Sequence, residues 1–314
     1  MEFNKEELVD WAKSILQVPV FEVHEITHTE YSHVLQLTTS KDTYYIKQTP
    51  SEFFVECEVL KFLNDKDTKG IAKLIAVDEE RKAFITKNVG DMSLREYCAE
   101  EFEPEINLAA LKQYRQIQKQ FNDVDMQSYI DKGCPDWRGK KFVEYFKQKI
   151  LNDELLKSWD MPESDIETLK AKTDTVVELK QQLSDLNVED TLCHSDFNEG
   201  NIRVNLDDKE ISIIDWGELN ISNPLLSLSS YLYGIRGHYD ISEDNLRYKN
   251  LEKEAFYLYG IEEDQLELAV DLSYKLGILY YVFTYIDLME SCDFDFPNNH
   301  EKLRSALLEF IEVA

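Results

Sequence analysis

Apolar residues in the first 90 positions follow first a helical and then a strand-like period. Asn4 and Glu7 are spaced as a helix start, and apolar residues follow on one face of the predicted helix. Beyond residue 20 the pattern changes to short β-branched and aromatic runs bounded by turn residues, with one helical stretch between them. These patterns predict a small antiparallel-sheet lobe with strands at 21–26, 31–38, 43–47, 71–77 and 82–89 and a helix at 51–64.

After a connector at residues 89–91, the apolar residues follow a mainly helical period. Ser93 and Glu96 form a capping-box pattern, and the residues from Ser164 predict one long helix that runs to about residue 186. The change of period indicates a boundary between two lobes. We therefore expect an α+β fold with a small lobe at residues 1–88 and a larger, mainly helical lobe at residues 89–314, which contains a helical insert at about 105–190.

Composition and charge exclude several classes of partner. The 314 residues include 62 acidic and 34 basic side chains, and a net charge of -28 argues against binding to nucleic acid or to an anionic membrane surface. The most apolar stretch, residues 276–289, is shorter than the ~20 residues of a membrane span and is expected as a core helix. An acidic start without a signal pattern and five cysteines without a CxxC pair favour a cytoplasmic protein, either a monomer or a homodimer.

The densest chemistry lies past the middle of the chain. His194, Asp196 and Asn201 are spaced i, i+2 and i+7, and Asp215 follows Asn201 at the end of a Val- and Ile-rich run. Alternating runs on either side of the turn at 207–210 predict a hairpin, which would make Asn201 and Asp215 cross-strand neighbours. A loop carboxylate followed by oxygen ligands for a metal is the order of parts that phosphoryl transfer uses.

Each of these residues can be given a role from its chemistry. Asp196, with an ordinary carboxylate pKa of about 4, is ionised at neutral pH and can accept the proton of an attacking hydroxyl. Asn201 and Asp215 offer the hard oxygen ligands that Mg²⁺ prefers. The sequence therefore predicts a phosphotransfer centre with Asp196 as the catalytic base and with Asn201 and Asp215 at the metal.

These motifs resemble those of the aminoglycoside phosphotransferase and choline kinase group, whose usual form is His-Gly-Asp with a later Asn, then Ile-Asp-Trp and a proline. The matching residues are His194-Ser195-Asp196 with Asn201, then Ile214-Asp215-Trp216 with Pro224. The resemblance covers most of the chain in order and implies a protein-kinase-like two-lobe fold with ATP in the cleft. It also implies that His194 braces the catalytic loop through hydrogen bonds without touching substrate.

The resemblance extends to the small lobe. Lys47 looks like the strand lysine that contacts the α- and β-phosphates, and Glu56 looks like the helix glutamate that pairs with it. Glu52, on a nearby face of the same helix, is the alternative partner. The connector resembles the family's hinge, so backbone groups of Thr86 and Asn88 are expected to hold the adenine edge. The small lobe would then bind the nucleotide, and the larger lobe would supply catalysis and acceptor binding.

The sequence also departs from the family pattern. Ser195 replaces the usual glycine, and Ser227 stands where the family often has Asp. The turn expected to cover the phosphates, residues 27–33, contains no glycine, and Glu30 would repel phosphate if its side chain faced inward. A catalytically weak, nucleotide-binding regulator of the same fold is therefore an alternative function.

The remaining histidines and the aromatic residues near the C-terminus are given structural roles. The histidines share no metal-ligand spacing, and the aromatic residues recur at helical spacing, which favours core packing over cation binding. The histidines are His24, His28, His33, His238 and His300, and the aromatic residues are Tyr231, Tyr233, Tyr280, Tyr281, Phe283 and Tyr285.

Together these features predict a kinase that uses ATP, with GTP as an alternative donor, and Mg²⁺ to transfer the γ-phosphoryl group to a small-molecule hydroxyl. Aminoglycosides, choline-like amines, amino-alcohols and sugars all fit the motif. The acidic composition tilts the choice toward a cationic acceptor, although acidic side chains also serve as a solvation surface. The large helical insert disfavours a protein substrate.

Overall fold

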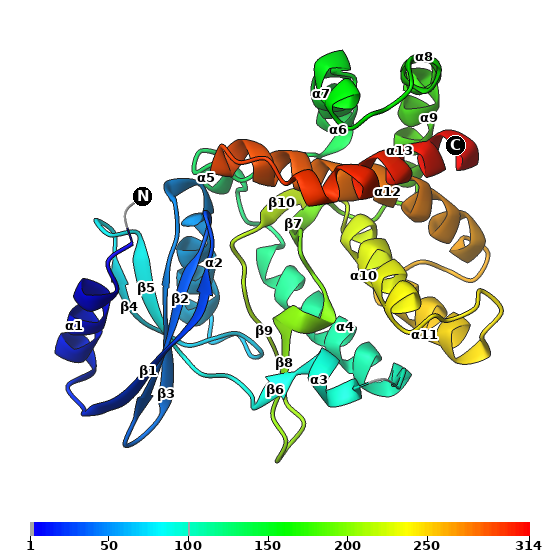
Figure 1. Ribbon diagram of the computed structural model, residues 1–314. Coiled ribbons are helices and arrows are strands. Elements are labelled where there is room, and N and C mark those ends of the chain that lie inside the picture. The colour runs from blue at the N-terminus through cyan, green and yellow to red at the C-terminus, as the bar shows by residue number, and fades with distance from the viewer. Residues whose placement is uncertain (1–2, 100) are drawn as a thin grey trace.

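The computed structural model describes residues 3–99 and 101–314. An antiparallel sheet and its helices form one lobe, and a larger, mainly helical lobe lies beside it (Figure 1). The predicted α+β class is therefore confirmed. Met1 and Glu2, which belong to the predicted small lobe, lie outside the described residues, and the exact lobe boundaries stay predictions.

The small lobe is built on an antiparallel sheet with the strand order β1-β2-β3-β5-β4. The predicted strands all form, and the second begins at His33 because Thr29 and Ser32 close a tight turn before it. Helix α1 starts as predicted, with the Asn4 side chain accepting the Glu7 backbone N–H. The elements are α1 (Lys5–Leu16), β1 (Val20–His28), β2 (His33–Thr39), β3 (Thr43–Gln48), η1 (Ser51–Phe53), α2 (Val55–Asp65), β4 (Leu74–Asp78) and β5 (Ala83–Lys87).

Helices α1 and α2 cover opposite faces of this sheet. Ala83 and Ile85 of β5 belong to the buried cluster around α1, whereas Phe84 between them packs into the cluster that contains α2. This division follows from the two-residue period of a strand, which sends successive side chains to opposite faces. The α2 face is the one that looks toward the larger lobe (Figure 1).

The larger lobe packs its helices around two short groups of strands, β10-β7 and β6-β8-β9. The predicted hairpin forms as β8 and β9, and the capping box at Ser93 and Glu96 is present. The elements are β6 (Met92–Ser93), α3 (Leu94–Cys98), α4 (Pro104–Gln118), η2 (Lys119–Phe121), α5 (Gln127–Ile130), α6 (Gly139–Tyr145), η3 (Phe146–Ile150), α7 (Asp153–Ser158), α8 (Glu163–Ala171), α9 (Thr173–Asp185), β7 (Thr191–His194), η4 (Glu199–Asn201), β8 (Ile202–Val204), β9 (Ile211–Ile213), β10 (Leu219–Ser222), α10 (Pro224–His238), α11 (Leu246–Tyr257), α12 (Leu266–Cys292), η5 (Pro297–Asn299) and α13 (His300–Val313).

The prediction of one long helix from Ser164 to about residue 186 is wrong. Two helices, α8 and α9, replace it, and the first begins directly after Pro162. The break lies at Lys172, next to Thr173, whose hydroxyl donates to the Lys170 carbonyl at 2.7 Å. A hydroxyl bonded to the preceding turn competes with the helical hydrogen-bond ladder, which the apolar period alone does not reveal.

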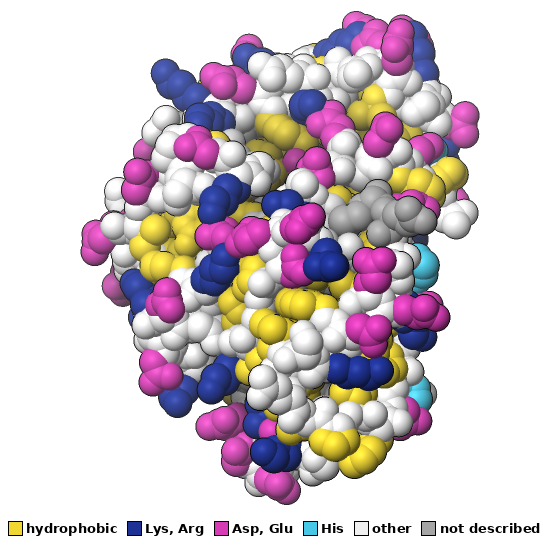
Figure 2. All heavy atoms as spheres, turned by 90° about the vertical axis from the view of Figure 1, so that its left-hand side faces the viewer, with side chains coloured by type: hydrophobic (Ala, Val, Ile, Leu, Met, Phe, Trp, Pro, Cys, Tyr) yellow, Lys and Arg dark blue, Asp and Glu magenta, His cyan; other side chains and the backbone are white. Residues whose placement is uncertain are grey.

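Charge is spread over the surface of the small lobe. Figure 2 views the molecule from the small-lobe side and shows acidic and basic side chains interspersed, with hydrophobic patches between them. The chain has a net charge of -28, but on this face its acidic side chains do not form one continuous patch. Among residues 3–99 and 101–314, no helix is long and apolar enough to cross a membrane.

Candidate active site

The catalytic loop leaves the end of strand β7. This strand pairs antiparallel with β10, with His194 opposite Leu219, and the Ser195 backbone N–H donates to the Glu218 carbonyl at 2.8 Å. These contacts fix the two residues before Asp196, whose own side chain is exposed. The strand pair therefore positions the backbone of the loop and leaves the carboxylate free to face a substrate.

Two asparagine side chains hold the carboxylate of Asp196. Asn198 Nδ2 donates to Oδ1 and Asn201 Nδ2 donates to Oδ2, both at 2.8 Å. Partial burial raises the pKa of Asp196 and the Asp215 carboxylate raises it further, which outweighs the lowering effect of the two amide donors. A carboxylate with a raised pKa and a fixed orientation suits proton abstraction from a hydroxyl.

His194 lies beneath this loop and is fully buried. Its backbone N–H donates to the Tyr114 hydroxyl at 2.8 Å, and its Nε2 lies 3.0 Å from the Ile214 carbonyl. Burial lowers the pKa of His194, so the ring is neutral and Nε2–H donates to that carbonyl. The ring thus ties the catalytic loop to the segment that carries Asp215, which is where a bracing residue has to lie.

The β8–β9 hairpin brings Asn201 and Asp215 together. Ile202 pairs with Ile213, and the Ile214 N–H donates to the Asn201 carbonyl at 3.0 Å. The Asn201 amide nitrogen is engaged by Asp196, which leaves its amide oxygen for another partner. A neutral oxygen beside an ionised carboxylate is a donor set that fits Mg²⁺.

Lys47 lies between two carboxylates. Its Nζ is 2.6 Å from Glu56 Oε2 and also contacts Asp215 Oδ1, while Glu56 Oε1 accepts the Trp216 backbone N–H at 3.0 Å. Burial would lower the pKa of Lys47, but Asp215 and Glu56 together outweigh it and raise the pKa. Burial would likewise raise the pKa of Asp215, and Lys47 holds it below the usual value. Glu56, rather than the exposed Glu52, is therefore the partner of the lysine.

These residues line a cavity of about 500 Å³ between the sheet and the β8–β9 hairpin. Lys47, Asn201 and Asp215 lie at one part of its wall, and the connector residues Thr86 and Asn88 also line it. The Asn88 backbone N–H already donates to the Thr43 carbonyl at 3.0 Å. This leaves the Asn88 carbonyl as the backbone group without that engagement, and the role of Thr86 and Asn88 at the adenine edge stays a prediction.

A model described as the phosphotransferase enzyme family matches residues 82–250, which is more than half of the chain. The chain belongs to the phosphotransferase enzyme family. It is thus an enzyme that transfers a phosphoryl group to a hydroxyl. No curated protein matches the sequence significantly.

Solved structures of this phosphotransferase family share the fold at low sequence identity. An ethanolamine kinase of Plasmodium vivax has a TM-score of 0.64 and 15% identity, covering 93% of this chain and 84% of that chain. The choline kinase LicA of Streptococcus pneumoniae has a TM-score of 0.63 and 12% identity, covering 98% and 99%. The ADP-bound aminoglycoside phosphotransferase APH(2'')-Ib has a TM-score of 0.60 and 14% identity, covering 99% and 98%. The implied protein-kinase-like two-lobe fold is therefore confirmed.

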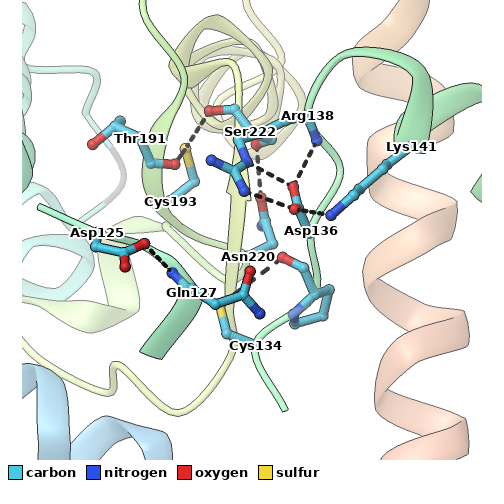
Figure 3. Close-up of polar contacts among 11 residues, drawn as sticks. Asp125, Gln127, Cys134, Asp136, Arg138, Lys141, Thr191, Cys193, Asn220 and Ser222 are labelled. Atoms are coloured by element: carbon cyan, nitrogen blue, oxygen red, sulfur yellow. Dashed lines mark hydrogen bonds and ion pairs between the residues drawn. The ribbon is translucent and has the colours of Figure 1, made fainter. Parts of the chain in front are cut away.

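A buried polar network supports the catalytic strands of the phosphotransferase. Asn220 Nδ2 donates to the Ser195 hydroxyl at 2.8 Å and to the Tyr280 hydroxyl at 2.7 Å, and Ser222 donates to Asn220 Oδ1 at 2.7 Å. Figure 3 shows Asp136 beside this network, paired with Arg138 and Lys141. The whole arrangement fixes β10, and β10 in turn fixes the catalytic loop.

Two residues near the catalytic loop, Glu218 and Tyr31, were not predicted from the sequence. Burial, together with the charges of Asp196 and Asp215, raises the pKa of Glu218 to about 8. Tyr31, from the turn between β1 and β2, lies near the same charges and packs its ring against Phe296 at 6.2 Å. The sequence feature that could have pointed to Glu218 is its position three residues after Asp215. No sequence feature pointed to Tyr31.

Two other predictions concern aromatic and histidine side chains. Tyr231, Tyr280 and Phe283 are buried core residues as expected, but Tyr233 is 47% exposed. The prediction that the histidines are too scattered for a metal site stays untested, but His28 and His33 are not scattered in the fold. These two lie directly opposite each other on β1 and β2, where Glu25 joins them. A hairpin brings together residues whose sequence spacing matches no metal motif.

Proposed function

We propose that the chain is an ATP-dependent small-molecule kinase, with GTP as an alternative donor, that phosphorylates a hydroxyl of a cationic acceptor. The observation that carries the proposal is the shared cavity wall of Lys47, Asn201 and Asp215, with Asp196 bonded to Asn201 at its edge. Here the small lobe, residues 1–88, binds the nucleotide. Residues 89–314 carry catalysis and acceptor binding.

Asp196 is the proposed catalytic base. The acceptor oxygen forms a bond to the γ-phosphorus, the bond from that phosphorus to the β-phosphate oxygen breaks, and the acceptor proton passes to the Asp196 carboxylate. Asn198 and Asn201 hold this carboxylate in one orientation through 2.8 Å hydrogen bonds. The residue therefore contributes both position and proton affinity.

Lys47 is the proposed phosphate ligand, held in place by Glu56. The 2.6 Å ion pair removes the freedom of a long side chain and keeps its ammonium in the cavity. When bound to oxygens of Asn201 and Asp215, Mg²⁺ would supply positive charge to the phosphates. Asn88 would contact the base through its carbonyl, since its N–H is engaged by Thr43.

A cationic acceptor is supported by two acids, Glu218 near Asp196 and Asp287 on α12. Both are partly buried, and their pKa values are raised to about 8 and about 7, first by burial and then by neighbouring acids. An ammonium group near them would favour their charged forms and compensate their burial. The partly buried ring of Tyr285, which feels the charges of Asp196 and Glu218, could contact the same cation. Choline, ethanolamine and aminoglycosides, named for the similar structures, all carry nitrogen cations.

A second candidate, a nucleotide-binding regulator without efficient turnover, is favoured by the turn that should cover the phosphates. The Thr29 N–H donates to the Ser32 carbonyl at 2.9 Å, and the Ser32 N–H donates to the Thr29 hydroxyl at 3.0 Å. Both amides are thus used inside the turn and cannot hold phosphate oxygens without rearrangement.

The experiment is an acceptor panel with ATP and GTP, read by release of the nucleoside diphosphate. Choline, ethanolamine, an aminoglycoside and a neutral sugar cover the acceptor classes, and Asp196→Asn is the matched inactive variant. We expect transfer to at least one cationic acceptor and a loss of about 10²–10⁴ in kcat for Asp196→Asn. Full activity of Asp196→Asn would refute the mechanism, and Mg-dependent ATP binding without transfer to any acceptor would favour the regulator.

The acceptor assignment has its own test in Glu218→Gln. Loss of a charged partner for an ammonium is worth about 1.5–3 kcal/mol, so KM for the best cationic acceptor should rise by roughly 10-fold or more. KM for ATP should stay unchanged. Because Glu218 ionises near pH 8 in the free enzyme, acceptor KM should fall as pH rises toward 8 in the wild type and not in the variant. Equal acceptor KM values in the two proteins would contradict the assignment.

A further inference from the structure

The hairpin of β1 and β2 carries a cluster of two histidines and a glutamate on its outer side. His28 and His33 are opposite residues in the strand register, and Glu25 lies three residues before His28 on β1. Candidate ligand atoms of the three residues all lie within 4.8 Å of one another. Thr27 and Val34 of the same strands line the nucleotide cavity, whereas Glu25, His28 and His33 do not line it.

The distances within the cluster match those of a tetrahedral metal site. His33 Nε2 lies 3.2 Å from Glu25 Oε2, and His28 Nδ1 lies 3.7 Å from Glu25 Oε1. Zn²⁺ binds imidazole nitrogen and carboxylate oxygen at about 2.0–2.2 Å, which places tetrahedral ligand atoms roughly 3.3–3.6 Å apart. Only small side-chain movements would therefore be needed to bring one ion into contact with all three residues.

The surroundings hold the two imidazole rings in place and leave one of them accessible. The rings stack with centroids 4.6 Å apart, and Phe3 packs edge-on against both of them, at 5.4 Å from His28 and 5.0 Å from His33. The His33 side chain is 2% exposed, whereas those of His28 and Glu25 are 53% and 41% exposed. His28 also lines a surface cavity of about 550 Å³ with Thr29 and Glu30, which gives an ion a path from solvent.

We infer that Glu25, His28 and His33 form a binding site for one divalent transition-metal ion, with Zn²⁺ as the best fit. Two neutral imidazoles and one carboxylate are ligands of this class of ion, whereas Mg²⁺ and Ca²⁺ prefer all-oxygen sites. Three protein ligands leave a fourth position for water or a ligand from solution. The positive charge of Lys5 acts on Glu25, so a bound metal ion would be repelled by the Lys5 ammonium unless that side chain moves away.

The site would clamp the hairpin that carries the turn over the nucleotide cavity. His28 and His33 directly flank the residues 29–32, and Tyr31 within that turn packs its ring against Phe53 at 6.1 Å. An ion that joins the two strands at this point would restrict the opening of the hairpin end. The expected consequence is a rise in the thermal stability of the protein on metal binding, since only the folded chain brings the ligands together.

The test is a Zn²⁺ titration of the full chain without a histidine tag, after removal of metals with a chelator. Binding is followed by competition with a fluorescent zinc indicator, and coordination by visible absorption of a Co²⁺ complex. Millimolar Mg²⁺ and an Asp215→Asn background exclude binding at the active site. At pH 7.5 we expect one Zn²⁺ per chain and a higher Tm with Zn²⁺ than in chelator.

The variants His28→Gln and Glu25→Gln should each weaken Zn²⁺ binding at least 10-fold and remove the rise in Tm. Both side chains are substantially exposed, and unchanged Tm values in chelator will show that the variants fold. His24→Gln is the matched control, because His24 lies on the same strand and faces Glu22 at 2.9 Å without a second histidine. The proposal is refuted if His28→Gln and Glu25→Gln titrate like the wild type, or if the wild type takes up no Zn²⁺. No nucleotide or acceptor is present, so the result is independent of the proposed kinase activity.

Discussion

Lys47→Met is the most direct perturbation of the charged network in the cavity. The substitution removes the ammonium and keeps an unbranched apolar stem of similar length. Glu56, which is 3% exposed and lies 2.6 Å from Lys47 Nζ, would lose its countercharge. Asp215 would lose the same partner. The variant therefore leaves two carboxylates close together, one of them buried.

The loss of stability in Lys47→Met depends on how well other groups stabilise the two carboxylates that lose their partner. Removing one member of a buried ion pair costs about 3–5 kcal/mol. Glu56 keeps its 3.0 Å hydrogen bond from the Trp216 N–H, and the Asp215 side chain is 51% exposed to water. We therefore expect the lower end, about 3 kcal/mol, which corresponds to a fall in Tm of roughly 6 °C for a chain of this size. The double variant Lys47→Met/Glu56→Met should regain at least half of the loss, because no buried charge is left without a partner.

Thermal and urea unfolding without nucleotide measure this effect, and Lys61→Met is the matched control. Lys61 also contacts two carboxylates, at 3.1 and 2.8 Å, but its side chain is 36% exposed, so its loss should cost less than about 1 kcal/mol. In Lys47→Met the pKa of Glu56 is raised above its unfolded value, so stability should increase as pH falls toward 5. The reasoning is refuted if Lys47→Met and Lys61→Met lose equal stability, or if the Lys47 and Glu56 substitutions are additive.

Two further predictions concern the catalytic loop and the connector. Asn198→Ala removes a hydrogen-bond donor that lowers the pKa of Asp196. The acidic limb of the pH profile of kcat/KM should therefore move to higher pH by roughly half a unit. The control Asn205→Ala, in the hairpin turn, should leave this limb unchanged. Gly90→Ala should destabilise the protein by about 2–3 kcal/mol in urea unfolding, because φ is +88° and the new Cβ would lie 3.0 Å from the backbone of the adjacent strand. Gly133→Ala, with φ of +99° and open space around it, should cost only about 1 kcal/mol.

The donor side of the site could be predicted because its residues lie in contiguous motifs. Asp196 and Asn201 are in one loop, and a hairpin with a clear turn signal returns Asp215 to Asn201. Lys47 could be placed because the order of a strand lysine followed by a helix glutamate resembles the family pattern. Local sequence patterns thus determine most of the backbone that carries these residues.

Features that depend on side-chain contacts between elements could not be predicted. The sequence predicts Glu56 as the partner of Lys47 but leaves Glu52 as the alternative, because a periodic pattern does not show that Glu52 lies in η1, before α2 begins. The engagement of the Asn88 N–H by Thr43 depends on the register between β3 and the connector. The cluster of Glu25, His28 and His33 likewise arises only when β1 and β2 pair, with His28 opposite His33.

The proposed acceptor side illustrates the same limit. Glu218 directly precedes β10, Tyr31 comes from the turn between β1 and β2, Tyr285 from α12, and Phe296 from the segment before η5. No two of these positions are close in sequence except the last pair, so no short motif can encode the pocket. Each can change without disturbing Asp196 or the ion pair of Lys47, because those residues are held by β7, β10 and the β8–β9 hairpin. With the proposed roles, an acceptor-side residue can change while the residues proposed for phosphoryl transfer stay in place, which is why Glu218→Gln should alter KM for the acceptor and leave KM for ATP as it is.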